Sequence, residues 1–211
     1  MSGTHGGHWR DQEQSCCLKA LSTISGLLAA KAGEIRFDGA SLKGRPAHVR
    51  ASLGIAHVLE RRRVFPHLTV LQNLTLGAWH AAAKAARPRS LERIFTLFPR
   101  LSERKSQFAR TLSGGEQQML ALGRGLMALP RLLMGDEPFL GLAPRVVEQM
   151  KSVFQALQAE GIAILFIEQN VRLALSIAGR GYILESGHLA IEGDAPTLIN
   201  SPVVRRIFLG G

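Results

Sequence analysis

Apolar residues recur along this chain with two different spacings. Strands are predicted where apolar runs are continuous or alternating, over residues 34–37, 53–59, 131–135, 162–167 and 181–192. Helices are predicted where the spacing is helical, over residues 18–28, 75–86, 90–98, 117–129, 144–159, 171–178 and 196–209. Strands that alternate with helices indicate an α/β domain with a parallel sheet. Asp38-Gly39 follows the first run and predicts a hairpin turn.

The length, composition and net charge of the chain limit the classes of function that it can have. With 211 residues, 46% of them apolar, the chain can form one domain with a core. Its formal charge of +10 favours phosphates, nucleic acid or an anionic membrane surface as partners. Arg61–Arg63 is the one tight basic run, so nucleic acid is not expected. Cys16 and Cys17 are adjacent and lack metal-ligand spacing. No apolar run approaches the roughly 20 residues of a membrane span, so we expect a soluble protein with at most peripheral membrane contact.

The residues with the clearest chemistry lie between Leu112 and Pro144. Ser113-Gly114-Gly115-Glu116 is a glycine-rich turn, and a helix behind it points its N-terminus toward an anion. A short apolar strand follows and ends in Asp136-Glu137. One carboxylate there can hold Mg²⁺ through water while the next orients an attacking water. Alone, each segment is more simply a helix cap or a solvated loop. Their order, with one helix between them, indicates a phosphate-handling site.

The amino-acid sequence of this stretch resembles that of a known family. LSGGEQQMLALGRGLM and EPFLGLAP are similar to the signature motif, Walker B motif and D-loop of ATP-binding cassette (ABC) ATPases. They look most like the ATP-binding subunits of branched-chain amino acid importers. The resemblance runs from about Leu18 to the C-terminus and leaves residues 1–17 unmatched. It implies a P-loop NTPase-like cassette over residues 18–211, with a helical subdomain over about 70–129.

The resemblance also implies a role for each site residue. Two such subunits sandwich two ATP molecules, so the 113–116 turn of one subunit faces the ATP held by the other. The residues that would contact nucleotide there are Ser113, Gly114, Gly115 and Glu116. Asp136 would hold Mg²⁺ through water, and Glu137 would act as the general base or orient the water.

Three further residues receive roles from the resemblance. Glu60 lies in the Q-loop, which contacts Mg²⁺ or water and senses the membrane partner; most families carry Gln there. Gly141 lies in the D-loop between the two ATP sites. Gln169 stands where a switch histidine usually touches the γ-phosphate, and it can donate a hydrogen bond but cannot titrate. From the residues alone, Gln169-Asn170 is equally a cap for the helix that follows.

The implied cofactors are ATP and Mg²⁺, and the implied activity is ATP hydrolysis that energises transport. The implied partners are a second ABC subunit, membrane permease subunits and, indirectly, a substrate-binding protein. The implied location is the cytoplasmic face of the cell membrane, as a peripheral protein. Two rival functions stay open. One is a non-catalytic subunit that supplies its signature motif to a partner's ATP. The other is a soluble DNA-repair-type ABC ATPase, although the coiled-coil or zinc insertions usual in that class are not seen.

One family motif is not found in the sequence. A P-loop has the pattern G-x-x-x-x-G-K-[ST], and this chain contains no Gly-Lys pair. The positions where it is expected, 13–17, read EQSCC, and no apolar strand precedes them. Three explanations compete: a disrupted or misplaced start, with family sequence resuming near Leu18; a natural degenerate subunit; or an unfamiliar phosphate loop that residues 1–17 form from Gly3, Gly6 and Gly7. Without that strand, Leu132–Gly135 and Ile162–Ile167 are expected to lack a pairing partner on one side.

Overall fold

The computed structural model describes residues 18–60, 63–185 and 187–204. The predictions for residues 1–17, for Arg61 and Arg62, and for 205–209 therefore lie outside the described residues. A helix over 18–25 comes first, followed by the antiparallel pair β1 (Arg36–Phe37) and β2 (Ala40–Ser41). Asp38 and Gly39 between them both have positive φ, 48° and 75°. The predicted hairpin is confirmed.

Helix α2 (Ala47–Ser52) connects this lobe to the rest of the chain. Its Arg50 is buried, and the guanidinium donates to the backbone carbonyls of Thr23, Ile24 and Leu42. Because a buried cation is costly unless it is hydrogen-bonded, these contacts fix the first helix, the lobe and α2 to one another.

Among the described residues, three parallel strands form the central sheet, in the order β3 (Ile55–Val58), β4 (Leu132–Asp136) and β5 (Ala163–Ile167). The predicted parallel α/β sheet is confirmed. The expectation that strand 132–135 lacks a partner on one side is wrong, because β3 and β5 flank β4. Within the described residues β5 pairs with β4 alone, as expected for that strand.

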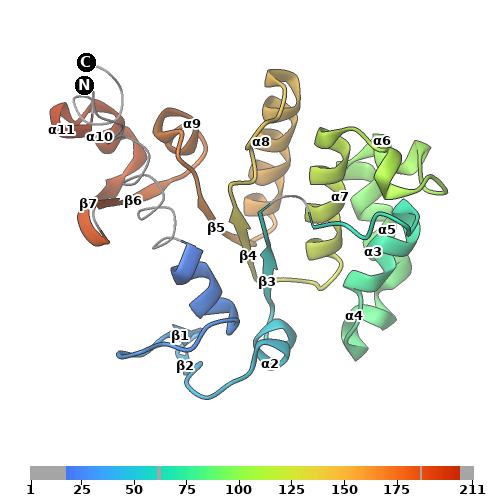
Figure 1. The fold of residues 1–211 in the computed structure, drawn as a ribbon, viewed down its shortest axis with the longest axis horizontal. Coiled ribbons are helices and arrows are strands. Elements are labelled where there is room, and N and C mark those ends of the chain that lie inside the picture. Colours follow the sequence, from blue (N-terminus) through green and yellow to red (C-terminus); the bar gives the residue numbers. More distant parts are fainter. Residues whose placement is uncertain (1–17, 61–62, 186, 205–211) are drawn as a thin grey trace, which may run out of the picture.

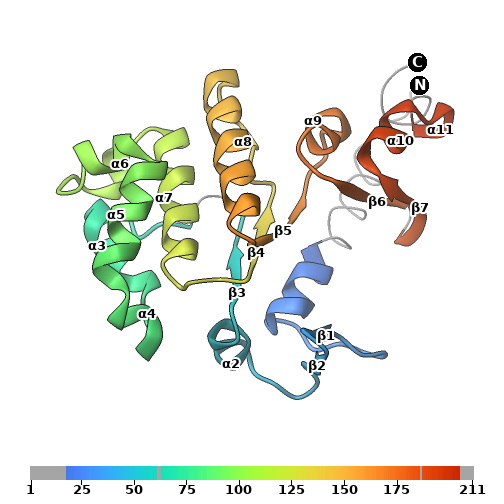
Figure 2. The same cartoon turned by 180° about the vertical axis from the view of Figure 1, so that it is seen from behind.

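Helices cover the sheet and hold its core (Figures 1 and 2). Helix α7 (Gly114–Leu126) packs against β3, and α8 (Pro144–Ala159) packs against β5. The largest apolar cluster joins both helices to β3 and β4. The rings of Phe139, Phe154 and Phe166 lie 5.4–5.9 Å apart in it. The residues at the ends of β4 and β5 are therefore held on a rigid base.

A group of helices lies beyond α7 from the sheet, within the stretch 70–129 that was expected to form a helical subdomain (Figure 1). It contains α3 (Val70–Gly77), α4 (Ala81–Ala85), α5 (Arg87–Leu97) and α6 (Pro99–Glu103). The single helix predicted over 75–86 is wrong. The helix stops after Gly77, and His80 begins a new one, since its Nδ1 accepts a hydrogen bond from Ala83 N–H at 3.4 Å.

The last elements form a separate small unit. Helix α9 (Val171–Leu175) precedes β6 (Arg180–Glu185) and β7 (His188–Asp194), an antiparallel pair that confirms the predicted hairpin. Helices α10 (Ala195–Asn200) and α11 (Pro202–Val204) follow. The tail predicted as one helix is therefore interrupted at Ser201, ahead of a proline. Among the described residues, no helix is long and apolar enough to cross a membrane.

Candidate functional site

The first feature of the site is the turn at the start of α7. The helix begins at Gly114, earlier than the predicted start at Gln117. The Ser113 hydroxyl oxygen accepts from Glu116 N–H at 3.3 Å, and the Glu116 carboxylate accepts from Ser113 N–H at 2.8 Å. This reciprocal capping box makes the turn part of the helix, which the glycine-rich sequence concealed.

The two glycines of this turn lie at the start of α7. A Cβ on Gly115 would lie 3.2 Å from both methyl carbons of Val146, so the turn packs against the first turn of α8. The N–H groups of Gly114 and Gly115 lie in the first turn of α7, where no intrahelical carbonyl can accept from them. Ser113 is exposed. The turn can therefore present N–H donors and a hydroxyl to an anion.

The second feature is a group of carboxylates at the carboxyl ends of the strands. Asp136 and Glu137 are 3% and 5% exposed. Burial, then the charge of Glu60 and that of Glu137, raise the pKa of Asp136 from 3.8 to about 6, against a backbone hydrogen bond from Glu60. The sequence-predicted residues Glu60, Asp136 and Glu137 are thus brought together, although they come from segments far apart in the chain.

Gln169 also reaches this group. Its Nε2 donates to Glu137 Oε1 at 2.6 Å. Glu137 has a φ of 45°, in the left-handed region that costs a non-glycine residue about 1–2 kcal/mol. Asn170, the next residue, caps α9 by accepting from Leu173 N–H. The alternative of a helix cap at Gln169-Asn170 is therefore confirmed for Asn170, while Gln169 is directed to the carboxylate.

Glu168 is a residue that sequence reasoning missed. Its carboxylate accepts from Phe139 N–H at 3.0 Å, while Glu137 N–H donates to Ile167 O. Burial, opposed by the Phe139 hydrogen bond and reinforced by the charges of Glu137 and Asp136, raises the pKa of Glu168 to about 7. The turn after β4 is therefore held to the end of β5. A glutamate directly after an apolar strand was the signal that could have found it.

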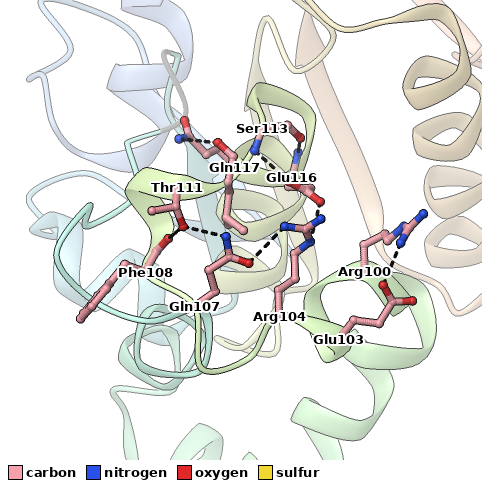
Figure 3. A network of polar contacts seen from close by, with 10 residues as sticks. Arg100, Glu103, Arg104, Gln107, Phe108, Thr111, Ser113, Glu116 and Gln117 are labelled. Carbon is pink, nitrogen blue, oxygen red and sulfur yellow. Dashed lines mark hydrogen bonds and ion pairs between the residues drawn. The ribbon is translucent and has the colours of Figure 1, made fainter.

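Gly141 follows in the segment after β4, and no hydrogen bond among the described residues connects it to the carboxylates. It is exposed and has a φ of 65°, which glycine adopts without strain. The 113–116 turn likewise belongs to a second polar group, built from α6, α7 and the residues between them (Figure 3). The sequence-predicted site therefore forms two groups on this chain.

Comparison with known proteins identifies the family. The family described as ABC transporter matches residues 19–140, over half of the chain. The chain belongs to the ABC transporter family. It is 43% identical over 191 residues to the "high-affinity branched-chain amino acid transport ATP-binding protein BraG" of Pseudomonas aeruginosa, covering 90% of this chain and 82% of that relative. It is 34% identical to a "probable branched-chain amino acid transport ATP-binding protein LivF" of Archaeoglobus fulgidus, covering 90% of this chain and 80% of that one.

Solved ABC cassettes have the same fold. A nucleotide-free ATP-binding cassette from an ABC transporter aligns with a TM-score of 0.77 at 23% identity, over 95% of this chain and 85% of that one. The ADP conformation of the cassette MJ1267 aligns with a TM-score of 0.76 at 24% identity, over 92% and 83% of the two chains. The expected cassette fold is confirmed, and ATP hydrolysis coupled to transport is the activity of this family.

The two polar groups of this ABC cassette fit different parts of Mg-ATP. The buried carboxylates around Asp136 repel one another, so a divalent cation would relieve that repulsion. Among the described residues, no three His, Cys, Asp or Glu side chains are placed to hold a metal by themselves. That suits Mg²⁺, which usually takes one or two carboxylates and completes its shell with waters and phosphates. The turn at Ser113 fits a phosphate, whereas the sequence contains no Gly-Lys pair to cradle one beside the carboxylates.

Proposed function

We propose that this chain is the ATP-binding subunit of an ABC importer for branched-chain amino acids. The supporting observation is the hydrogen bond from Gln169 to Glu137 beside the buried Asp136. An amide donor and two carboxylates therefore lie close together at one end of the sheet. Such groups can orient a water and hold a metal during hydrolysis of a phosphoanhydride. The substrate class rests on the relatives named for branched-chain amino acid transport.

Each residue of the site has its own role in the proposed hydrolysis of ATP. Bound Mg-ATP supplies the electrophilic phosphorus and the charge of the metal. Glu137 orients the attacking water and accepts its proton, and Gln169 holds the Glu137 carboxylate in position. Asp136 and Glu60 would hold the metal. In the proposed dimer, the Ser113 hydroxyl of one subunit would donate to the terminal phosphate on the other, since its oxygen already accepts from Glu116 N–H. A similar cassette, at 20% identity, is described as dimeric and bound to ADP and phosphate.

Substitution of Glu137 tests the catalytic assignment. In a version of the chain that carries a grafted P-loop, Glu137→Gln should slow ATP turnover by about 10²-fold or more while nucleotide affinity is retained. Glu148→Gln, a change at an exposed position on α8, serves as the matched control and should have no effect. Unchanged turnover in Glu137→Gln would contradict the assignment of Glu137 as the catalytic carboxylate.

A second candidate function is a subunit that supplies only its signature turn. Two observations support this alternative. The sequence contains no Gly-Lys pair, and the turn at Ser113 is nevertheless fully formed in the structure. Calorimetry of the original chain with Mg-ATP should then detect no binding, or binding weaker than the low micromolar range. Tighter binding would show that the chain contains a phosphate site of another kind.

A mixed dimer tests the role of the signature turn itself. The chain is combined with a member of the family that carries a P-loop and whose own signature serine has been replaced by alanine. Hydrolysis at that relative's P-loop then depends on Ser113, and Ser113→Ala should lower it by about 10²-fold. Ser152→Ala, at an exposed serine on α8, is the control. An inactive wild-type mixture would contradict the proposal.

The permease partner has a candidate docking surface in the helical subdomain. Phe65, Leu71 and Phe108 are 51%, 38% and 47% exposed. Backbone hydrogen bonds join their segments, from Val70 N–H to Gln107 O and from Ala109 N–H to Leu68 O. Exposed apolar side chains gathered on a rigid base are typical of an interface. Phe108→Asp should weaken binding to purified membrane subunits of a branched-chain amino acid importer; equal binding would contradict this assignment.

A further inference from the structure

A chain of polar contacts connects the end of α6 to the turn at Ser113 (Figure 3). Arg104 Nε lies 3.0 Å from Glu116 Oε1, and Arg104 Nη1 donates to Gln107 Oε1 at 3.1 Å. Gln107 Nε2 donates in turn to Thr111 Oγ1 at 2.8 Å. Arg104, Gln107 and Thr111 carry no role from the sequence motifs, and all three lie between the end of α6 and the start of α7.

Glu116 is the member that touches the turn. One of its carboxylate oxygens pairs with Arg104, and the other accepts from Ser113 N–H. Its side chain is 14% exposed and that of Arg104 39% exposed, so water screens the pair less than it screens an ordinary surface pair. Burial raises the pKa of Glu116, but the hydrogen bonds from Ser113 and the charges of Arg104 and Arg100 outweigh it and hold that pKa below its usual value. The glutamate therefore stays ionised and keeps both partners.

The orientation of Ser113 depends on this carboxylate. The Ser113 N–H is directed to Glu116 Oε2, and its hydroxyl oxygen accepts from Glu116 N–H, so the hydroxyl proton remains available to a ligand. If Glu116 were free to rotate, the serine would lose the contact that fixes its backbone. Arg104 limits that rotation from the other side, because it also holds Gln107.

We propose that Arg104 is a positioning residue for ATP hydrolysis: through Glu116 it sets Ser113 toward the terminal phosphate of the ATP held by the partner subunit. The inference rests on the proposed function of the 113–116 turn. Gln107 extends the link to the docking surface, because its backbone carbonyl accepts from Val70 N–H. Arg104 thus joins the segment that would bear the permease to the serine that would meet the nucleotide.

Three variants of the full chain separate positioning from general stability. Arg104→Ala removes the pair with Glu116, and Arg104→Lys keeps the charge but not the planar guanidinium. Arg100→Ala is the matched control, because it breaks the exposed Arg100–Glu103 pair on α6 and removes a charge that acts on Glu116 without a hydrogen bond to it. Hydrogen exchange is measured at the amides of Ser113 and Glu116, and thermal unfolding checks that each variant is folded.

The expected results are specific to the turn. Arg104→Ala should speed exchange at Ser113 and Glu116 by about 10-fold, since a hydrogen bond to a charged group is loosened. Arg104→Lys should fall between it and the wild type, and Arg100→Ala should match the wild type. In the mixed dimer, Arg104→Ala should lower kcat about 10-fold with an unchanged KM for ATP, because the partner's P-loop sets nucleotide affinity.

Two outcomes of the exchange experiment would overturn the inference: unchanged exchange in Arg104→Ala, or the same acceleration in Arg100→Ala. A parallel rise in KM with no loss of kcat would also overturn it, because the residue would then act on nucleotide binding. Faster exchange in Arg104→Ala together with an inactive wild-type mixed dimer would instead overturn the proposed function, and would leave the contact between Arg104, Glu116 and Ser113 established.

Discussion

Strands β4 and β5 lie side by side and in register, yet they differ in how well they are covered. β5 is the more apolar in sequence, AILFI against LLMGD. Leu133 to Asp136 of β4 are nevertheless buried, whereas no residue of β5 is fully buried. The difference follows from pairing, because β3 and β5 flank β4 while β5 has β4 on one side only among the described residues.

Some backbone groups of β5 face the side on which no strand of the described residues pairs with it. Ala163 N–H donates to Arg131 O, and Ile167 O accepts from Glu137 N–H, so these residues direct their backbone groups toward β4. Backbone groups alternate in direction along a strand, so those of Ile164 and Phe166 are directed to the other edge. An apolar strand with an unpaired edge is a template for aggregation. A hydrophobic sequence therefore does not by itself secure a buried strand.

The largest effect is expected from giving β5 a second partner. An apolar strand followed by G-x-x-x-x-G-K-[ST], grafted ahead of Leu18, should raise the melting temperature by about 10 °C or more. Each buried backbone group that gains a partner avoids a cost of roughly 1–3 kcal/mol. The original chain should be unstable or aggregation-prone when expressed alone, and the grafted one should be soluble and bind ATP.

Thermal unfolding and light scattering of the original and the grafted chain, side by side, provide the measurement. A graft with two prolines in the strand is the control, since proline removes the N–H that pairing needs while the phosphate loop is retained. Equal melting temperatures, with the original chain soluble and monomeric, would show that the open edge of β5 carries no penalty.

A smaller effect on stability is expected when one apolar side chain in each strand is truncated to alanine, and it should differ between the two strands. Leu133 of β4 is 1% exposed, and Leu133→Ala should lower the free energy of unfolding by about 3 kcal/mol. Ile164, its neighbour in β5, is half-buried, and Ile164→Ala should cost only about 1 kcal/mol. Urea denaturation of both variants gives the comparison. Equal losses would mean that β5 is as well covered as β4.

The smallest effect concerns the carboxylate that links the ends of the two strands. The pKa of Glu168 is raised in the folded chain to about 7, so the folded state holds a proton that the unfolded state releases near pH 4.5. This contribution to stability is complete below about pH 4.5 and is lost as pH rises to about 7. Glu168→Gln, which keeps the acceptor for Phe139 N–H, should therefore leave stability unchanged at low pH and raise the melting temperature by about 1–3 °C at pH 8.

The difference between variant and wild type is the quantity to follow. Burial lowers the pKa of His57 to about 4, so this residue makes the wild type more stable as pH rises from about 4 to 6.5. Subtracting the two pH profiles cancels that opposite trend. A difference that does not change with pH would show that Glu168 keeps an ordinary pKa.

The signals that predicted elements well were local ones. The sixteen residues of α8 were predicted at both ends because a proline opens the helix and Gly161 follows it. Both hairpins were predicted from alternation and turn residues. The start of α7 was misplaced because a glycine-rich turn reads as a loop unless the capping partners are known to meet. The break at Ala78 was missed because the alanine-rich segment that follows it has high helix propensity, so one helix was extended across the break.

The sequence by itself determined the parallel α/β architecture, the family and the residue types of the site, since period, turn chemistry and motif spacing are all written in local order. Only the tertiary structure decided which strands pair, and it gave β4 the two neighbours that the sequence had led us to doubt. It also decided that Glu168 joins the carboxylates and that Arg104 holds Glu116. Those contacts join residues that lie far apart in the chain or carry no motif, and their geometry exists only once the helices and the sheet have packed.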